Sequence, residues 1–453
     1  MALLVAGAFF MEILDGTIIA PAIPLIAASF GVAPVNINVA ISAYIVTVAV
    51  LIPASGWMAD RFGIRRVFLA AIVIFTLASV GCALSVSLPM LVATRILQGV
   101  GGAMMVPVGR LAVLRHTSKS DLIRAIALLV WPALAAPVIA PVLGGAIATL
   151  GSWRWIFLIN VPIGIVGLVL AFKLVHGGPA ETPKPLDWRG MLALGSGIAA
   201  ALVALESIRV SGTNWWMVAG GALSSAVLLT AAVVHLRRAE NPLVQLQVLR
   251  FRSLRITVSA GSVYRMVITA VPFLLPLQFQ LVFGWSPFLA GLMVATLFAG
   301  NLTIKPLTTP LMRRFGIKRV LLVNGVLSVL WFGLLALLQP DLPIWLIIVI
   351  LYVSGALRSI GFTAYNSLAF ADVDGDDLTH GNTLNASVQE LAAGVGVALA
   401  AVLLGQFTVL AGADPGLAYS WTFGTLAVVL ALTLIETLRL PGDAGATVSG
   451  ARR

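Results

Sequence analysis

The octet "DRFGIRRV" (Asp60–Val67) returns 253 residues further along the chain as "RRFGIKRV" (Arg313–Val320). Each copy lies between two long apolar stretches. Two near-identical basic segments could arise by chance, form a nucleic-acid patch or mark an internal duplication. The surroundings of the octets favour the duplication, because short basic loops between apolar runs are typical of membrane proteins with several spans.

The composition supports a membrane protein and excludes several other classes. Of 453 residues, 60% are hydrophobic and only 10% are charged, and the mean hydropathy is +1.05. The net charge of +11 does not indicate nucleic-acid binding, because the basic residues lie in short loops. Cys82 is the only cysteine and the four histidines are scattered, so no intramolecular disulfide, metal site or cofactor is expected.

Apolar runs of spanning length predict fourteen transmembrane helices. The opening thirty residues are too long for a cleavable signal and are interpreted as the first, retained span. The predicted spans are 3–28, 37–58, 67–86, 89–112, 123–149, 153–174, 190–208, 215–235, 256–283, 287–311, 319–338, 342–367, 383–410 and 417–437.

The distribution of basic residues predicts the orientation in a cell (inner) membrane. Outer loops hold only Arg154 and Arg209, so both termini are expected in the cytoplasm. The inner loop "ADVDGDDLTHGN" is acidic instead; it faintly resembles a calcium loop, but a solvated acidic loop fits its spacing better.

Eight spans separate the two octets, whereas a duplicated six-span unit would separate them by six. Two spans are therefore interpreted as an insertion after the Pro-rich segment "HGGPAETPKPLDWRG". The predicted domains are an N-terminal six-helix bundle (1–175), a linker with an inserted helix pair (176–254), a C-terminal six-helix bundle (255–438) and a cytoplasmic tail (439–453).

The first octet sits in the larger unit "GWMADRFGIRRVF" (Gly56–Phe68). Glycine near a span end allows helices to approach closely, and Asp60 can form a charge-assisted pair. The arginines face the anionic inner leaflet. The unit is interpreted as a cytoplasmic gate made of Gly56, Asp60, Arg61, Gly63, Arg65 and Arg66.

Ionisable residues inside spans usually face a bundle interior or a wet cavity. Glu12 and Asp15 are three residues apart, on one helical face, and Asp15 is the preferred proton carrier. A static pair between Asp15 and Arg95 is the alternative, and static salt bridges between spans could explain the other charges. The predicted proton-coupling and substrate cavity comprises Glu12, Asp15, Arg95, Gln98, Arg265, Lys305, Arg358, Gln389 and Glu390.

Several stretches resemble the major facilitator superfamily, and within it the fourteen-span drug:proton antiporters of the EmrB/QacA type, including MdtD-like members. The resemblance covers nearly the whole chain. Besides the Gly56–Phe68 unit, it rests on "LDGTIIAPAIP" (Leu14–Pro24), "RILQGVGGAMMVP" (Arg95–Pro107), "APVIAPVLGG" (Ala136–Gly145), "SWRWIFLINVPIG" (Ser152–Gly164) and the segment from "FTAYNSLAFAD" to "GNTLNASVQELAAGVGVALAAV".

The resemblance implies an all-α polytopic fold with two six-helix bundles around a central cavity, plus two extra central helices. It also implies a hinge in the fifth span, which prolines should kink and glycines should pack closely. Ala140 stands where the family pattern has glycine. The hinge residues are Pro137, Pro141, Gly144 and Gly145.

The function expected is proton-coupled efflux of lipophilic or cationic small molecules, of the multidrug type. The alternatives are export of one endogenous metabolite or siderophore-like compound, and a membrane sensor or scaffold. An enzyme is not expected, because the sequence has no phosphate-binding loop, nucleophile elbow or metal cluster. The expected partners are a small-molecule substrate, protons and the lipid bilayer; the chain is expected to be a monomer, with a periplasmic adaptor as an open alternative.

Overall fold

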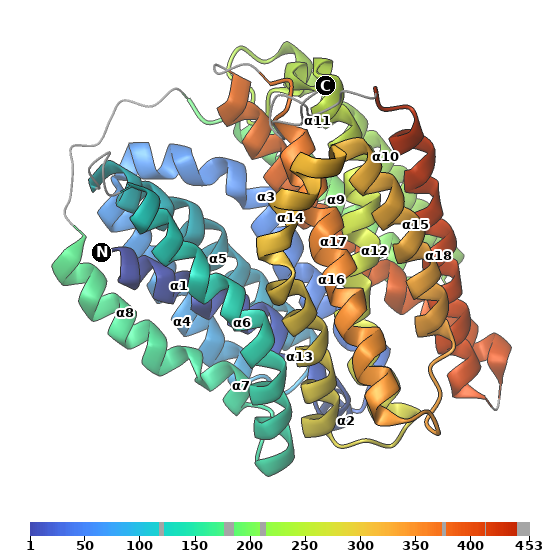
Figure 1. Cartoon of the computed structure of the whole chain (residues 1–453). Helices are drawn as coiled ribbons and strands as arrows, with labels where there is room; N and C mark the ends of the chain where they lie inside the picture. Colours follow the sequence, from blue (N-terminus) through green and yellow to red (C-terminus); the bar gives the residue numbers. More distant parts are fainter. Residues whose placement is uncertain (117–121, 176–184, 209–213, 374–376, 413, 442–453) are drawn as a thin grey trace.

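The computed structural model describes residues 1–116, 122–175, 185–208, 214–373, 377–412 and 414–441, and within them the chain is helical, without strands (Figure 1). Helices suit a bilayer because they satisfy every backbone polar group internally. The N-terminal bundle contains α1 (Ala2–Ile18), η1 (Ala20–Ala22), α2 (Ile23–Phe30), η2 (Pro34–Ile37), α3 (Asn38–Phe62), α4 (Ile64–Ala83), α5 (Leu88–His116), α6 (Leu122–Leu150), α7 (Trp155–Leu158) and α8 (Asn160–Leu174).

The inserted pair and the C-terminal bundle follow in chain order. The pair is α9 (Trp188–Glu206) and α10 (Trp215–Arg238). The C-terminal bundle contains η3 (Leu246–Arg250), α11 (Arg252–Ile256), the π-helical η4 (Thr257–Gly261), α12 (Ser262–Leu281), α13 (Pro287–Thr303), α14 (Lys305–Phe315), α15 (Ile317–Ala336), α16 (Ile344–Ala369), α17 (Leu378–Ala411) and α18 (Pro415–Leu438).

Each of the fourteen predicted spans coincides with helix in the structure. Among the described residues, twelve helices are long and apolar enough to cross a membrane, and α13 with α14 makes a thirteenth when the bent pair counts as one span. The remaining predicted span is α6, of which the stretch Ala135–Leu150 qualifies as a shorter apolar helix. The bend of 46° between α13 and α14 lies next to Pro306, which cannot donate a helical hydrogen bond.

The two octets have the same local structure. In each, a helix ends at phenylalanine, a glycine with positive φ reverses the chain direction, and the next helix begins at isoleucine. The φ angles are 85° at Gly63 and 78° at Gly316, a conformation that favours glycine. Phe62 and Phe315 are both 47% exposed. The repetition in sequence is therefore also a repetition in structure.

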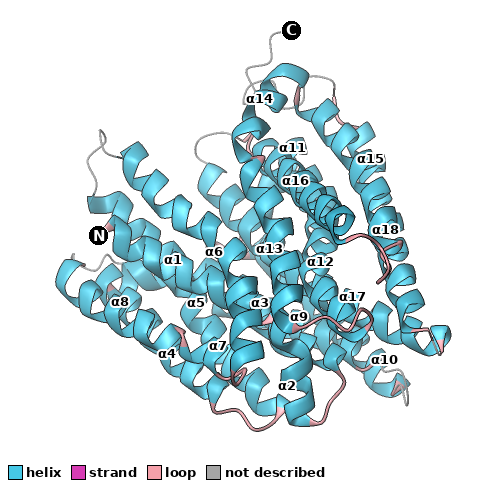
Figure 2. Ribbon diagram, turned by 60° about the horizontal axis from the view of Figure 1, so that its bottom comes forward, coloured by secondary structure: helices cyan, strands magenta, loops and turns pink. Residues whose placement is uncertain are grey.

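The two bundles meet at one end of the molecule and splay apart at the end that carries the octets, here called the octet end (Figure 1, Figure 2). Toward the opposite end, Gln280 donates a hydrogen bond to the Pro21 carbonyl oxygen at 2.8 Å. The Phe288 amide donates to Thr149 Oγ1 at 3.2 Å in the same region. The bundles are thus joined at the end away from the octets, here called the closed end.

Glycines allow this closure. A Cβ atom on Gly291 of α13 would overlap the Pro141 carbonyl oxygen of α6, and one on Gly145 of α6 would overlap the backbone of Pro287. Close backbone approach of this kind needs residues without a side chain. The inserted pair α9–α10 lies beside a second contact region between the bundles. There α9 contacts both α3 of the N-terminal bundle and α17 of the C-terminal bundle.

Candidate functional site in the N-terminal bundle

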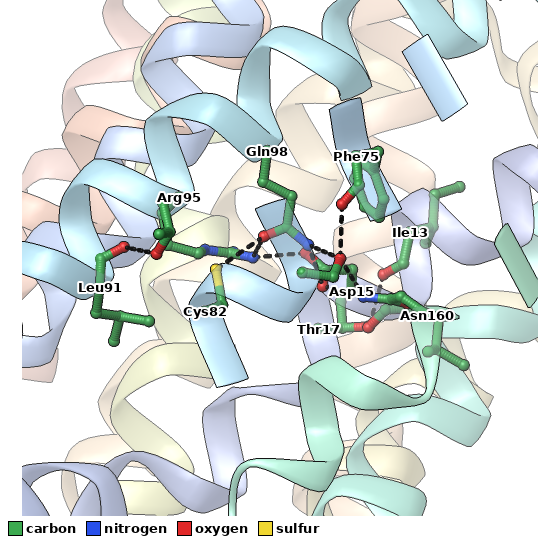
Figure 3. Close-up of polar contacts among 12 residues, drawn as sticks. Ile13, Asp15, Thr17, Phe75, Cys82, Leu91, Arg95, Gln98 and Asn160 are labelled. Carbon is green, nitrogen blue, oxygen red and sulfur yellow. Dashed lines mark hydrogen bonds and ion pairs between the residues drawn. The ribbon is translucent and has the colours of Figure 1, made fainter. Parts of the chain in front are cut away.

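Asp15 lies at the centre of a buried polar network (Figure 3). Its Oδ2 atom accepts a hydrogen bond from Arg95 Nη1 at 2.5 Å, which is also an ion pair. Its Oδ1 atom accepts from Gln98 Nε2 at 2.8 Å and from Asn160 Nδ2 at 2.6 Å. Gln98 Nε2 is also 2.8 Å from Ser79 Oγ. Helices α1, α4 and α8 each contribute one side chain, and α5 contributes two.

Aromatic rings and a thiol surround the charged pair. The Arg95 guanidinium carbon lies 4.3 Å from the centre of the Tyr44 ring and 5.8 Å from that of Phe157. The Cys82 thiol is 3.6 Å from Gln98 Oε1, the same atom that accepts from Arg95 at 2.7 Å. The pair is therefore shielded from water and oriented by neutral neighbours, which strengthens its electrostatic interaction.

The network keeps unused hydrogen-bonding capacity. Within the described residues, Arg95 Nε and Nη2 and Asn160 Oδ1 have no hydrogen-bond partner although they are buried. Buried polar atoms are nearly always satisfied, so such exceptions need an explanation. A network with spare donors and acceptors can change its pairing without changing its members.

The sequence identified Asp15, Arg95 and Gln98, but it did not identify Asn160, Ser79 or Tyr44. The contact between Asn160 and Asp15 spans 145 positions. A polar residue inside the quoted stretch "SWRWIFLINVPIG" was a usable signal, because an asparagine within a span is costly unless it is paired. Ser79 gave no such signal, since serine can bond to its own helix, as it does to the Phe75 carbonyl oxygen.

Glu12 does not join the network of Asp15, although both lie on α1. Its carboxylate and the Tyr44 hydroxyl both lie beside Gly102, and Glu12 Oε2 has no partner among the described residues. The charges of Glu390 and Asp15 both act on it. In the C-terminal bundle, Glu390 Oε1 of α17 is 3.6 Å from Arg265 Nη2 of α12. The Glu390 side chain is 36% exposed and the Arg265 side chain 19%.

Basic residues of the C-terminal bundle have different partners. Lys305 Nζ donates to Thr363 Oγ1 at 3.1 Å, and no acidic group pairs with it in the described part of the chain. The Arg358 guanidinium lies 5.2 Å from the centre of the Phe298 ring. Gln389 is buried, and its Oε1 atom has no partner among the described residues. The interpretation of static salt bridges therefore fits the Arg265–Glu390 pair better than Lys305.

The predicted gate residues lie at the octet end. Arg65 donates to the Phe172 carbonyl oxygen of α8 at 2.9 Å, and its guanidinium carbon lies 4.8 Å from the Phe172 ring centre. Arg61 and Arg66 are exposed, and the space beside Gly56 is open. The gate thus lies where the bundles are splayed, and Arg65 is bound within its own bundle.

The predicted hinge residues lie in the part of α6 that packs between α1 and α13. A Cβ atom on Gly144 would overlap the Ile18 carbonyl oxygen. Pro137 and Pro141 lie inside the helix, which continues through them. Asp377, in the acidic loop, pairs with Arg250 at 2.6 Å; Asp374 and Asp376 lie outside the described residues. No group of three or more His, Cys, Asp or Glu able to hold a metal occurs in the part of the chain that was described.

Comparison with known proteins agrees on one family. The model of the "Major Facilitator Superfamily" matches residues 5–396 and 257–450. The chain is 37% identical over 463 residues to the "Putative multidrug resistance protein MdtD" of Cronobacter sakazakii, covering 99% of this chain and 96% of the relative. The protein of that name from Salmonella paratyphi A is 36% identical over 448 residues, with coverage of 97% and 94%.

Solved structures show the same fold at low identity. A D-xylose-proton symporter matches with a TM-score of 0.68 at 16% identity, covering 99% of both chains. A POT family transporter in complex with 5-aminolevulinic acid matches with a TM-score of 0.69 at 15% identity, covering 98% of this chain and 96% of the other.

Proposed function

Because this chain belongs to the Major Facilitator Superfamily and is a transporter rather than an enzyme, we propose that it exports lipophilic, cationic small molecules in exchange for protons. The relatives named as multidrug resistance proteins support the substrate class. The sequence has no nucleotide-binding loop, so an ion gradient is the available source of energy.

The observation that carries the proton coupling is the fully buried Asp15 carboxylate with three hydrogen-bond donors. An ionised carboxylate only accepts, whereas a protonated one also donates. Proton binding would therefore displace one donor and leave Arg95 without its counter-charge. Because Asp15, Arg95 and Asn160 belong to α1, α5 and α8, this exchange would alter how three helices pack.

Glu12 and Glu390 support the cationic substrate. They come from different bundles, both are partly exposed, and their charges interact. A cation bound between the bundles would neutralise both and compete with Arg265 for Glu390. Export of one anionic metabolite is the second candidate, and Arg358, with an unpaired Nη1 atom among the described residues, favours it.

The test is transport in proteoliposomes with an imposed pH gradient, with tetraphenylphosphonium as the lipophilic cation. Asp15→Asn should abolish accumulation against the concentration gradient while tetraphenylphosphonium binding persists. Glu12→Gln should weaken binding and leave proton coupling intact. Uphill transport and proton movement at wild-type rates in Asp15→Asn would refute the assignment, and an anion transported in place of tetraphenylphosphonium would favour the second candidate.

A further inference from the structure

The second octet borders an apolar groove on the outside of the C-terminal bundle. The groove has a volume of about 390 Å³ and lies between α14, α15 and α16, which neighbour one another on the near face of Figure 1. Phe315, Arg319, Val323, Leu327 and Ile360 are among the residues that line it. Val323 is 60% exposed and Leu327 40%, so the groove opens outward.

The groove runs from the octet end into the depth of the bilayer. Arg319 and Leu327 are eight residues apart on α15, which corresponds to about 12 Å along a helix. One leaflet of hydrocarbon is about 15 Å thick. Apart from Arg319 at its mouth, the polar residue in its lining is Asn324, whose amide nitrogen already lies 3.3 Å from the Tyr264 hydroxyl. The groove therefore suits a hydrocarbon chain.

Two arginines stand at the mouth of the groove. Arg319 lines it directly, and the Arg314 guanidinium carbon lies 5.4 Å from the ring centre of Phe315, which also lines it. Neither arginine has an acidic partner within the described residues. Basic pockets between helices on the inner side of a membrane bind the headgroups of anionic lipids.

The first octet lacks this combination. It begins with Asp60, where the second octet has Arg313, so its charge is lower. Arg65 donates to the Phe172 carbonyl oxygen, and Lys318 donates to the Leu440 carbonyl oxygen. Each of these residues therefore bonds within its own bundle. The apolar groove beside α1 and α8 has no octet residue in its lining. The groove beside the second octet thus has an octet arginine, Arg319, in its lining, whereas the groove beside α1 and α8 has none.

We propose that the groove between α14, α15 and α16 binds one acyl chain of an anionic glycerophospholipid, whose phosphate is held by Arg314 and Arg319. Arginine forms bidentate hydrogen bonds with phosphate, which fixes the headgroup above the chain. The proposal does not depend on the transported substrate.

Native mass spectrometry of the full-length protein in detergent tests it, with titrations of phosphatidylglycerol and of phosphatidylcholine carrying the same acyl chains. Wild-type protein should retain phosphatidylglycerol at least about fivefold better than phosphatidylcholine. Arg314→Gln with Arg319→Gln should lower this retention about fivefold for each charge removed. Val323→Trp, which fills the groove and keeps both charges, should lower the retention of both lipids.

The matched control is Arg61→Gln with Arg66→Gln, which removes the corresponding charges of the first octet and should leave the retention unchanged. Equal loss from both double variants would reduce the effect to general surface charge and overturn the proposal. Equal retention of the two lipids by the wild type would also overturn it. A wild-type dimer that Val323→Trp abolishes without changing lipid retention would assign the groove to a second copy of the chain.

Discussion

At the scale of single residues, the pair of Asp15 and Arg95 is better explained by function than by stability. Removing two charges from water costs several kcal/mol each, and apolar replacements of such pairs are often equally stable. The unsatisfied Arg95 Nε and Asn160 Oδ1 atoms, among the described residues, add to that cost. A network selected for stability alone would have its donors and acceptors matched. The mismatch fits a network that exchanges partners.

Asn160 offers a prediction at this scale. Asn160→Ala removes the 2.6 Å hydrogen bond to Asp15 Oδ1 and leaves a buried carboxylate with one donor fewer. The free energy of unfolding should fall by about 1–3 kcal/mol, the range for a buried group that loses its partner. Thermal unfolding in detergent measures the loss, and proteoliposomes should show slower uphill transport.

Gln247→Ala is the control, because Gln247 is an exposed amide in η3 and takes no part in the network of Asp15. It should unfold at the wild-type temperature and transport at the wild-type rate. An Asn160→Ala protein as stable and as active as this control would show that Arg95 and Gln98 alone hold Asp15.

At the scale of helices, apolar runs predicted where spans lie, because length and hydropathy are properties of one segment. Interruptions within spans were harder to predict. The bend between α13 and α14 has a local signal in Pro306, whereas the π-helical turn Thr257–Gly261 has none. The network of Asp15 depends on which faces of α1, α5 and α8 meet. That is set by packing of the whole bundle, so only Asp15, Arg95 and Gln98 were identified beforehand.

The inserted helix pair is anchored by Asp187. It caps α9 by accepting from the Gly190 amide at 2.9 Å, and it also contacts His235 Nε2 of α10 at 2.7 Å and the Leu243 amide at 3.1 Å. Burial raises the pKa of Asp187, but these three hydrogen bonds outweigh burial, so the pKa lies below its ordinary value. The ionised carboxylate thus joins both helices to the segment that follows them.

Asp187→Ala should therefore loosen the start of α9 by about 1 kcal/mol at pH 7, the typical contribution of a helix cap. A lowered pKa means that this stabilisation is complete above the unfolded value of about 3.9 and is lost as the pH falls through the folded value. Hydrogen exchange of the first turn of α9, in wild type and variant at pH 7 and at about pH 3, measures the difference.

Asp414→Ala provides the comparison, because Asp414 caps α18 through a single hydrogen bond from the Leu417 amide at 3.2 Å. Its effect on α18 should be smaller than that of Asp187→Ala on α9. Equal exchange in wild type and Asp187→Ala at pH 7 would contradict the anchoring role.

At the scale of the whole molecule, each octet contributes a hydrogen bond that stays within its own bundle. In each octet the sixth residue, Arg65 or Lys318, donates to a carbonyl oxygen at the end of the last helix of its own bundle. These bonds hold each bundle together, while the contacts from Gln280 to Pro21 and from Phe288 to Thr149 join one bundle to the other. Movement between two states should therefore break the second kind and keep the first. Orientation in the membrane and the domain boundaries at 175, 254 and 438 stay predictions.

A covalent link at the closed end tests this division. With Cys82→Ser as the background, Thr149→Cys and Phe288→Cys would place two thiols on neighbouring residues, since the Phe288 backbone amide now lies 3.2 Å from Thr149 Oγ1. Oxidation should hold the bundles together at that end and stop transport, because a transporter must open alternately to both sides. Reduction should restore the rate.

Ser85→Cys with Thr94→Cys is the matched pair, since its two hydroxyls are 3.5 Å apart at the same end but within one bundle. If each bundle moves as a unit, oxidation of this pair should leave transport unchanged. Inhibition by both links would mean that helices move within a bundle during the cycle. Full transport by the oxidised Thr149–Phe288 link, with its formation verified by mass spectrometry, would show that the contact between α6 and α13 persists in every state and that the opening must occur elsewhere.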